Sequence, residues 1–157
     1  MKNNPLFQFL VVRTLHRMTA KAMGVPFQGG KPVLQAYAVF TREQSVCADK
    51  AAQERMYQSA YWKGSMIRRI LWIRTDERAQ RVLFWLYRNI GMELEGTCPG
   101  AVQVCRCYFS EFYTPEMCQV MSAMDRGIFA GLFGGGELTF ESRITEGCPC
   151  CRAIFHR

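Results

Sequence analysis

The sequence is short of histidine and of long hydrophobic runs, and it lacks the common nucleotide-binding and serine-nucleophile motifs. Its two histidines, His16 and His156, are too few for a zinc site of the HExxH type. No apolar run approaches the roughly 20 residues that a membrane-spanning helix needs. The sequence has no GxxxxGKS/T and no GxSxG segment, so neither a P-loop nor a nucleophile elbow is indicated.

The N-terminal segment does not resemble a secretory signal. Its apolar run from Leu6 to Val12 is interrupted by Gln8 and ends at Arg13, and no small-residue cleavage site follows. We therefore expect a cytoplasmic protein whose thiols stay reduced, because disulfides are rare in that compartment.

Charge and cysteine are distributed unevenly along the 157 residues. Residues 1–90 hold 15 Lys and Arg against 5 Asp and Glu, whereas residues 91–157 hold 5 against 8. Seven of the eight cysteines lie between Cys98 and Cys151. Because no linker separates the two parts, we expect a single domain over 1–157, with a basic helical subregion followed by a cysteine-rich one.

Hydrophobic spacing and cap residues predict a run of helices in the first part. The Thr41–Gln44 segment fits a capping box, in which the Thr hydroxyl and the Gln side chain satisfy free N–H groups at a helix start. Thr75 with two following acids predicts another helix start. The expected helices run from Pro5 to Gly24, from Val33 to Phe40, from Thr41 to about Trp62, and from Thr75 to Gly91. The last helix is expected to bury a stripe made of Val82, Trp85, Leu86 and Ile90.

The second part changes to the alternating pattern of strands. Residues 92–95, 101–109, 138–145 and 151–156 have this character. Thr114 followed by Pro115 predicts a helix that runs to about Phe129. The order β-β-α-β-β after several helices predicts an α+β fold, with N-terminal helices packed on a small antiparallel sheet.

This arrangement brings chemically reactive residues together. On a strand, Cys105 and Cys107 are expected to share one face, because side chains repeat every two residues. Seven residues apart on a helix, Cys118 and Asp125 share one stripe. If that stripe packs on the sheet, all four side chains meet in a pocket between the helix and the sheet.

Cys118 lies in the first turn of its helix, where the helix dipole favours a thiolate. A thiol of low pKa beside the Asp125 carboxylate is a nucleophile with an acid–base partner. The candidate catalytic residues are therefore Cys105, Cys107, Cys118 and Asp125. The plain alternative, that each cysteine is a small core residue, stays open.

The cysteines also permit a metal site. An alternative ligand set consists of Cys105, Cys107, Cys118 and Cys151, with zinc or iron as the candidate ions, although structural zinc sites more often use C-x₂₋₄-C pairs. Cys148 and Cys151 form a C-x-x-C motif, but it precedes a strand, whereas the redox motif normally opens a helix.

From Gly91 onward the chain resembles the L-2-amino-thiazoline-4-carboxylic acid hydrolase family. The resemblance rests on the strand cysteines, on Cys118 with Asp125 seven residues later, and on the segment Gly147-x-x-x-Cys151-x-x-x-Phe155. It implies opening of a cysteine-derived thiazoline ring to a carbamoyl cysteine, through Cys- or Asp-assisted attack at a C=N carbon. The substrate carboxylate would then be bound by Arg126 or Arg143.

The basic first part of the chain could also bind a membrane surface or a nucleic acid. Arg13, Arg17 and Lys21 form a basic helix face of the kind that can lie on anionic lipid, and arginines accompany aromatic residues between 61 and 88. We favour an ordinary solvated helix face over membrane-surface or nucleic-acid binding. The expected partner is a small molecule, and the oligomeric state stays open. The two functions carried forward are a hydrolase and a non-catalytic module that binds a metal or a small ligand.

Overall fold

Local sequence signals set where the helices begin and end. The computed structural model describes residues 5–27, 34–45 and 48–157. The first helix begins at Pro5, as expected, and stops before Gly24, whose φ of +71° favours glycine. Thr75 caps a helix start by accepting a hydrogen bond from the Arg78 N–H. The four helices of the first part are α1 (Pro5–Met23), α2 (Leu34–Ser45), α3 (Lys50–Ile70) and α4 (Asp76–Arg88).

The expected capping box at Thr41 is wrong. Thr41 is buried inside α2, and its hydroxyl donates to the backbone oxygens of Tyr37 and Ala38 at 3.0 Å. The next helix starts instead at Asp49, whose carboxylate accepts from the Ala52 N–H at 2.7 Å. Val33, where the second helix was expected to begin, lies outside the described residues.

The buried face of α4 is rotated from the expected stripe. Ala79, Leu83 and Tyr87 are buried, at the i, i+4, i+8 spacing of one helix face. Trp85 is 37% exposed and packs against Phe7 in a tilted arrangement, with ring centroids 4.0 Å apart. The expected stripe is therefore right in part. Val82, Leu86 and Ile90 are half-buried and pack against the main core, whereas Trp85 does not.

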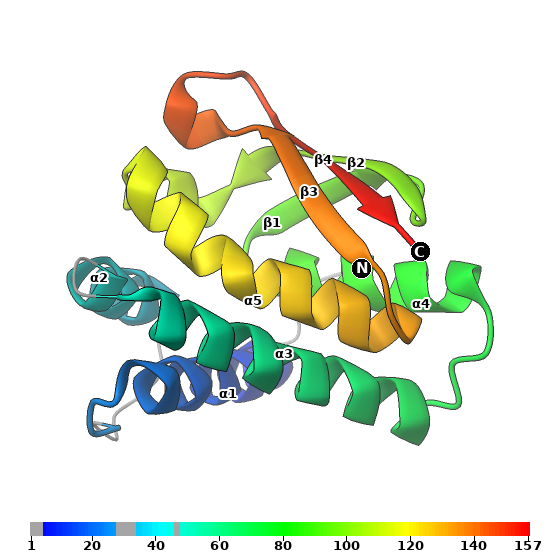
Figure 1. Cartoon of the computed structure of the whole chain (residues 1–157), viewed down its shortest axis with the longest axis horizontal. Helices are drawn as coiled ribbons and strands as arrows, with labels where there is room; N and C mark the ends of the chain where they lie inside the picture. Colours follow the sequence, from blue (N-terminus) through cyan, green and yellow to red (C-terminus); the bar gives the residue numbers. More distant parts are fainter. Residues whose placement is uncertain (1–4, 28–33, 46–47) are drawn as a thin grey trace.

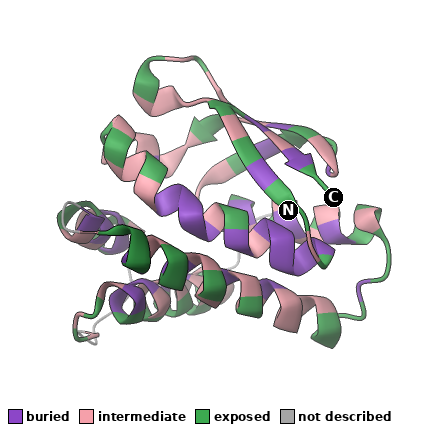
Figure 2. Ribbon diagram, viewed as in Figure 1, coloured by how far each residue is buried: buried purple, intermediate pink, exposed green. Residues whose placement is uncertain are grey.

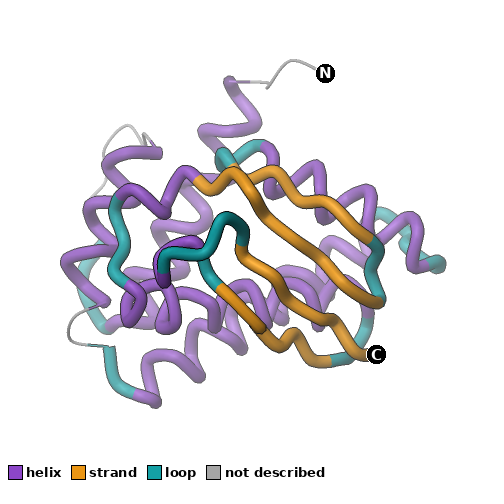
Figure 3. The backbone as a smooth tube through the Cα atoms, turned by 90° about the horizontal axis from the view of Figure 1, so that it is seen from above, coloured by secondary structure: helices purple, strands orange, loops and turns teal. Residues whose placement is uncertain are grey.

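The second part forms a four-stranded antiparallel sheet with the order β1-β2-β4-β3. The α+β fold with N-terminal helices is therefore confirmed, and one helix, α5 (Pro115–Phe133), separates the two strand pairs in sequence. Figures 1 and 3 show the sheet lying over α5, with α4 beside α5 and with α1 and α3 beyond it. The strands are β1 (Met92–Gly96), β2 (Gly100–Cys107), β3 (Glu137–Ser142) and β4 (Cys151–His156), and two 3-10 turns are η1 (Tyr108–Glu111) and η2 (Ile144–Glu146).

The central helix α5 lies between the sheet and α3, and most of its second half is buried (Figure 2). It begins with Thr114, whose hydroxyl accepts from the Met117 N–H at 3.3 Å, as the Thr-Pro pair predicted. The face of α5 that packs against α3 contains glycines. A Cβ atom at Gly131 would lie 2.1 Å from the Tyr61 backbone oxygen, and one at Gly127 would lie 2.3 Å from the Tyr57 oxygen. The two helices therefore touch backbone to backbone.

Within the residues that the structure describes, no helix has both the length and the hydrophobicity that crossing a bilayer requires.

Candidate functional site

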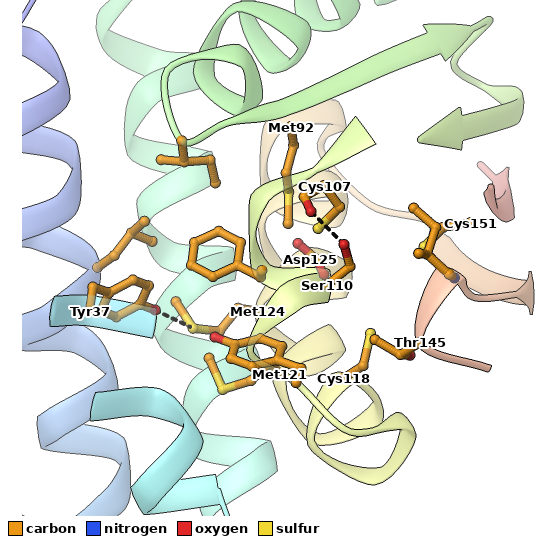
Figure 4. Close-up of a pocket in the computed structure, with 15 residues that line it drawn as sticks. Tyr37, Met92, Cys107, Ser110, Cys118, Met121, Met124, Asp125, Thr145 and Cys151 are labelled. Carbon is orange, nitrogen blue, oxygen red and sulfur yellow. Dashed lines mark hydrogen bonds between the residues drawn. The ribbon is translucent and has the colours of Figure 1, made fainter. Parts of the chain in front are cut away.

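A cavity of about 80 Å³ lies between the first half of α5, the end of β2 and the segment that leads into β4. Figure 4 shows its labelled side chains converging from these elements and from α2 and β1. Three free cysteines line it, Cys107, Cys118 and Cys151, together with the carboxyl group of Asp125. The rest of the wall is mostly aromatic and aliphatic. The cavity lies where the sequence analysis expected a pocket between helix and sheet.

The expectation that Cys105 joins this cluster is wrong. The β1–β2 register pairs Glu93 with Arg106 and Leu94 with Val104, so Cys105 is an inserted bulge residue. A bulge reverses the alternation of side chains beyond it, and Cys107 lines the cavity whereas Cys105 does not. Cys105 instead forms a disulfide with Cys150, so these two cysteines are not the reduced thiols that we expected.

Asp125 is the acidic centre of the cavity. The Tyr87 hydroxyl donates a hydrogen bond to Asp125 Oδ1 at 2.6 Å. Burial raises the pKa of Asp125 from 3.8 to about 6, while the Tyr87 hydrogen bond and the charges of Arg143 and Arg126 act in the opposite direction. A carboxyl group with a pKa near neutrality can both accept and return a proton, which is the requirement for general acid–base catalysis.

Cys118 does not have the low pKa that its helix position suggested. Burial raises its pKa, and the nearby Asp125 raises it further, although the Thr145 hydroxyl and Arg143 oppose this. The helix start supplies little stabilisation for a thiolate. Pro115 has no N–H group, and Thr114 already accepts hydrogen bonds from the Met117 N–H through its hydroxyl and from the Cys118 N–H through its backbone oxygen at 2.9 Å.

The other two thiols are also in their neutral form near neutral pH. Burial raises the pKa of Cys107 to about 12, despite the opposing backbone N–H groups of Phe109 and Ser110. Burial likewise raises the pKa of Cys151, whose Sγ accepts a hydrogen bond from the Ile144 N–H at 3.3 Å. Because the thiolate is the nucleophilic form, all three cysteines form a soft, uncharged wall.

Only one of the two predicted arginines lies beside this wall. Arg126 is exposed and lines a separate surface depression with Glu54 and Glu137. Arg143 directly precedes η2, its guanidinium lies 4.5 Å from the Phe140 ring centroid, and it pairs with Glu146 at 3.5 Å. Its Nε is buried without a hydrogen-bond partner. Arg143 does not line the cavity itself, but its charge acts on Asp125 and on the thiols of Cys118 and Cys151, whereas that of Arg126 acts on Asp125 alone among these groups.

The alternative metal set is not assembled. Cys105 is engaged in the disulfide, and Cys107, Cys118 and Cys151 share the cavity without forming a metal-binding group. Across residues 5–27, 34–45 and 48–157, no three His, Cys, Asp or Glu side chains are placed to hold an ion. The bulge is the physical reason, because it removes one thiolate from the face that carries the others.

The tyrosines around the cavity were not predicted from the sequence. Tyr37 lines it, and its hydroxyl lies 3.0 Å from Thr19 Oγ1. Tyr113 also lines it and bonds to Thr41. Buried tyrosine hydroxyls need partners, so a tyrosine on an apolar helix face is a signal for a polar group inside. If the buried face of α4 had been assigned correctly, Tyr87 would have been identified as such a tyrosine.

The chain matches no protein-family model and no curated protein sequence. The resemblance to the thiazoline hydrolases therefore rests on the residues quoted for it. Of those, Cys107, Cys118, Asp125 and Cys151 share the cavity, and Cys105 lies outside it.

Proposed function

We propose that the cavity between α5 and the sheet hydrolyses a small molecule at a C=N carbon, with Asp125 as general base and then general acid. The observation that carries this proposal is the Asp125 carboxyl group, whose pKa of about 6 is set in a cavity that also contains three neutral thiols. Groups with such shifted pKa values in a cavity are typical of proton-transfer sites. The resemblance to thiazoline hydrolases names a substrate class with this chemistry.

The proton inventory of the reaction needs only Asp125 and water. A water molecule adds its oxygen to the C=N carbon and passes one proton to the Asp125 carboxylate, which returns it to the ring nitrogen as the C=N bond becomes single. Asp125 then takes the remaining O–H proton as the C=O bond forms and the ring C–S bond breaks, and it returns this proton to the leaving sulfur, which gives a carbamoyl cysteine. The Tyr87 hydrogen bond holds the carboxylate in place for these transfers.

Attack by water is favoured over attack by a cysteine. A covalent route needs a thiolate, and the raised pKa values of Cys107, Cys118 and Cys151 keep these groups protonated. We therefore assign the cysteines to shaping the wall, and we assign Arg143, whose Nε has no partner, to the substrate carboxylate. Arg126 has no role in this proposal, because it lies on the surface outside the cavity.

Turnover of 2-amino-thiazoline-4-carboxylate is the direct test. We expect the wild-type protein to release carbamoyl cysteine, measured by chromatography and mass detection. Asp125→Asn should lower kcat by roughly a hundredfold or more, the usual contribution of a general base. Glu141→Gln is the matched control, since Glu141 is exposed on β3. The activity should rise with pH through about 6, as Asp125 deprotonates. Full turnover by Asp125→Asn would disprove the mechanism.

The second candidate is a non-catalytic binding module for a small apolar ligand. The observation that favours it is the cavity wall, which is mainly apolar apart from Asp125 and the hydroxyl groups. Saturable binding of a small ring compound without any turnover by the wild-type protein would select this candidate over the hydrolase.

A further inference from the structure

A larger cavity, of about 320 Å³, lies among α1, α3, α4 and α5. Its volume falls in the range of pockets that enclose ligands, roughly 300–1,000 Å³, whereas the cavity beside the thiols is smaller. The two cavities adjoin, because Leu15, Ile90, Met124 and Asp125 line both. The wall of the larger cavity is nearly all apolar, with contributions from Phe7, Leu10, Met18, Met66, Leu86 and Ile128.

The rim of this cavity is open to solvent and apolar. Leu10, which lines it, is 51% exposed. Met66 lines the cavity without belonging to any of the packed core clusters. An apolar entrance that leads to an unfilled apolar interior suits a flexible hydrocarbon chain.

One cation lies at the wall without a counter-charge. Lys63 lines the cavity, and its Nζ lies 5.0 Å from the Trp62 ring centroid. Among the residues that the structure describes, no carboxylate forms an ion pair with it. An ammonium group beside an apolar cavity therefore offers an attractive site for an anionic group.

We propose that this cavity binds a single-chain amphiphile, whose aliphatic chain fills the space among the four helices and whose carboxylate pairs with Lys63. The two cavities share Asp125, but the ligand and the residue that binds it, Lys63, have no part in the proposed hydrolysis, so binding at Lys63 is tested independently of turnover.

The direction of the ligand follows from the two charged groups in the wall. The pKa of Asp125 is about 6, so this group is negatively charged at pH 7 and repels a carboxylate placed next to it. Lys63 attracts the same group. The carboxylate therefore lies at Lys63, and the methyl end points toward the wall that the two cavities share.

Calorimetric titration with decanoate and with decanol tests the assignment. We expect one saturable site for each in the wild-type protein, with affinity rising about fourfold per methylene from hexanoate to decanoate. Lys63→Met should weaken decanoate binding by roughly tenfold and leave decanol binding unchanged. Lys21→Met removes the same charge from an exposed position on α1 outside the cavity, and it should bind both ligands like the wild type.

A second variant separates the cavity from the protein surface. Met66→Trp places a larger ring in the cavity wall and should weaken binding of both ligands, with circular dichroism and thermal melting used to verify the fold. The proposal is overturned if decanoate shows no saturable binding, or if Lys63→Met or folded Met66→Trp binds it as tightly as the wild type. It is also overturned if anionic phospholipid vesicles bind wild type and Met66→Trp alike while free decanoate binds neither.

Discussion

Replacing Asp125 with Asn should stabilise the protein increasingly as the pH rises. Burial raises the pKa of Asp125 from 3.8 to about 6 in the folded state. Between these two values the unfolded chain releases a proton that the folded chain retains, so the wild-type protein loses stability as the pH increases through this window. The Asn side chain keeps an oxygen that can accept the Tyr87 hydrogen bond, but it has no charge to bury.

The size of the effect follows from the two pKa values. A difference of this size corresponds to about 3 kcal/mol at full ionisation, because one pKa unit is worth about 1.4 kcal/mol. Most of this loss of stability develops over a limited pH range. Between about pH 4.5 and about pH 7.5, linkage gives a change of about 2 kcal/mol in the free energy of unfolding of the wild type relative to Asp125→Asn.

Urea unfolding of both proteins at these two pH values measures the difference directly. Glu141→Gln removes an exposed carboxylate from β3 and serves as the matched comparison. A constant difference between wild type and Asp125→Asn at both pH values would show that Asp125 has no raised pKa, and the acid–base role proposed for it would then have no basis.

Three other substitutions test separate parts of the structure. Tyr87→Phe removes a hydrogen bond to the Asp125 carboxylate and should raise the pKa of Asp125 by about one further unit. The pH dependence of stability or of turnover should then shift to higher pH, and a shift to lower pH would contradict the assigned donor. Gly131→Ala places a Cβ atom 2.1 Å from a backbone oxygen of α3 and should lower the free energy of unfolding by about 2 kcal/mol or more. An unchanged midpoint of urea unfolding would show that the two helices can separate freely. Cys150→Ser opens a disulfide that spans 45 residues and should cost about 4 kcal/mol under non-reducing conditions, whereas adding a reductant should not destabilise the variant further.

The helix starts were predictable where the signal is local. At Thr75 and Thr114 the capping hydroxyl bonds to an N–H group three residues away, so the sequence neighbourhood contains both partners. At Thr41 the same residue type has a different role, because its hydroxyl turns back to the carbonyl groups of α2 and to Tyr113 from a distant segment. Local spacing does not distinguish these outcomes.

The faces of β2 could not be derived from alternation alone. The pattern of two holds only while the strand stays in register with its partner, and the extra residue at Cys105 is defined by how β1 pairs with β2. Cys107 was therefore placed correctly on the cavity side, and Cys105 was not. The disulfide to Cys150 follows from the same pairing, since β4 begins beside β2.

The electrostatics of the site depend on tertiary burial. Cys118 lies near a helix N-terminus, as its position in the sequence indicated, yet its surroundings in the folded protein raise its pKa. Asp125 was recognised as the partner carboxylate, but its hydrogen-bond donor Tyr87 comes from α4, nearly forty residues earlier. Sequence spacing locates such groups on elements, and packing then sets their protonation.

The close contact of α3 and α5 limits how either cavity can adapt to a ligand. At Gly127 and Gly131 the two helices touch through their main chains, and main chain has no rotamers through which to make room, so the spacing of α3 and α5 beside Asp125 is fixed. A bulkier ligand must therefore be accommodated by the opposite walls, which α1 and the residues leading into β4 provide. Variation in ligand size among related sequences should accordingly appear as substitutions in those two segments, with the glycine contact left intact.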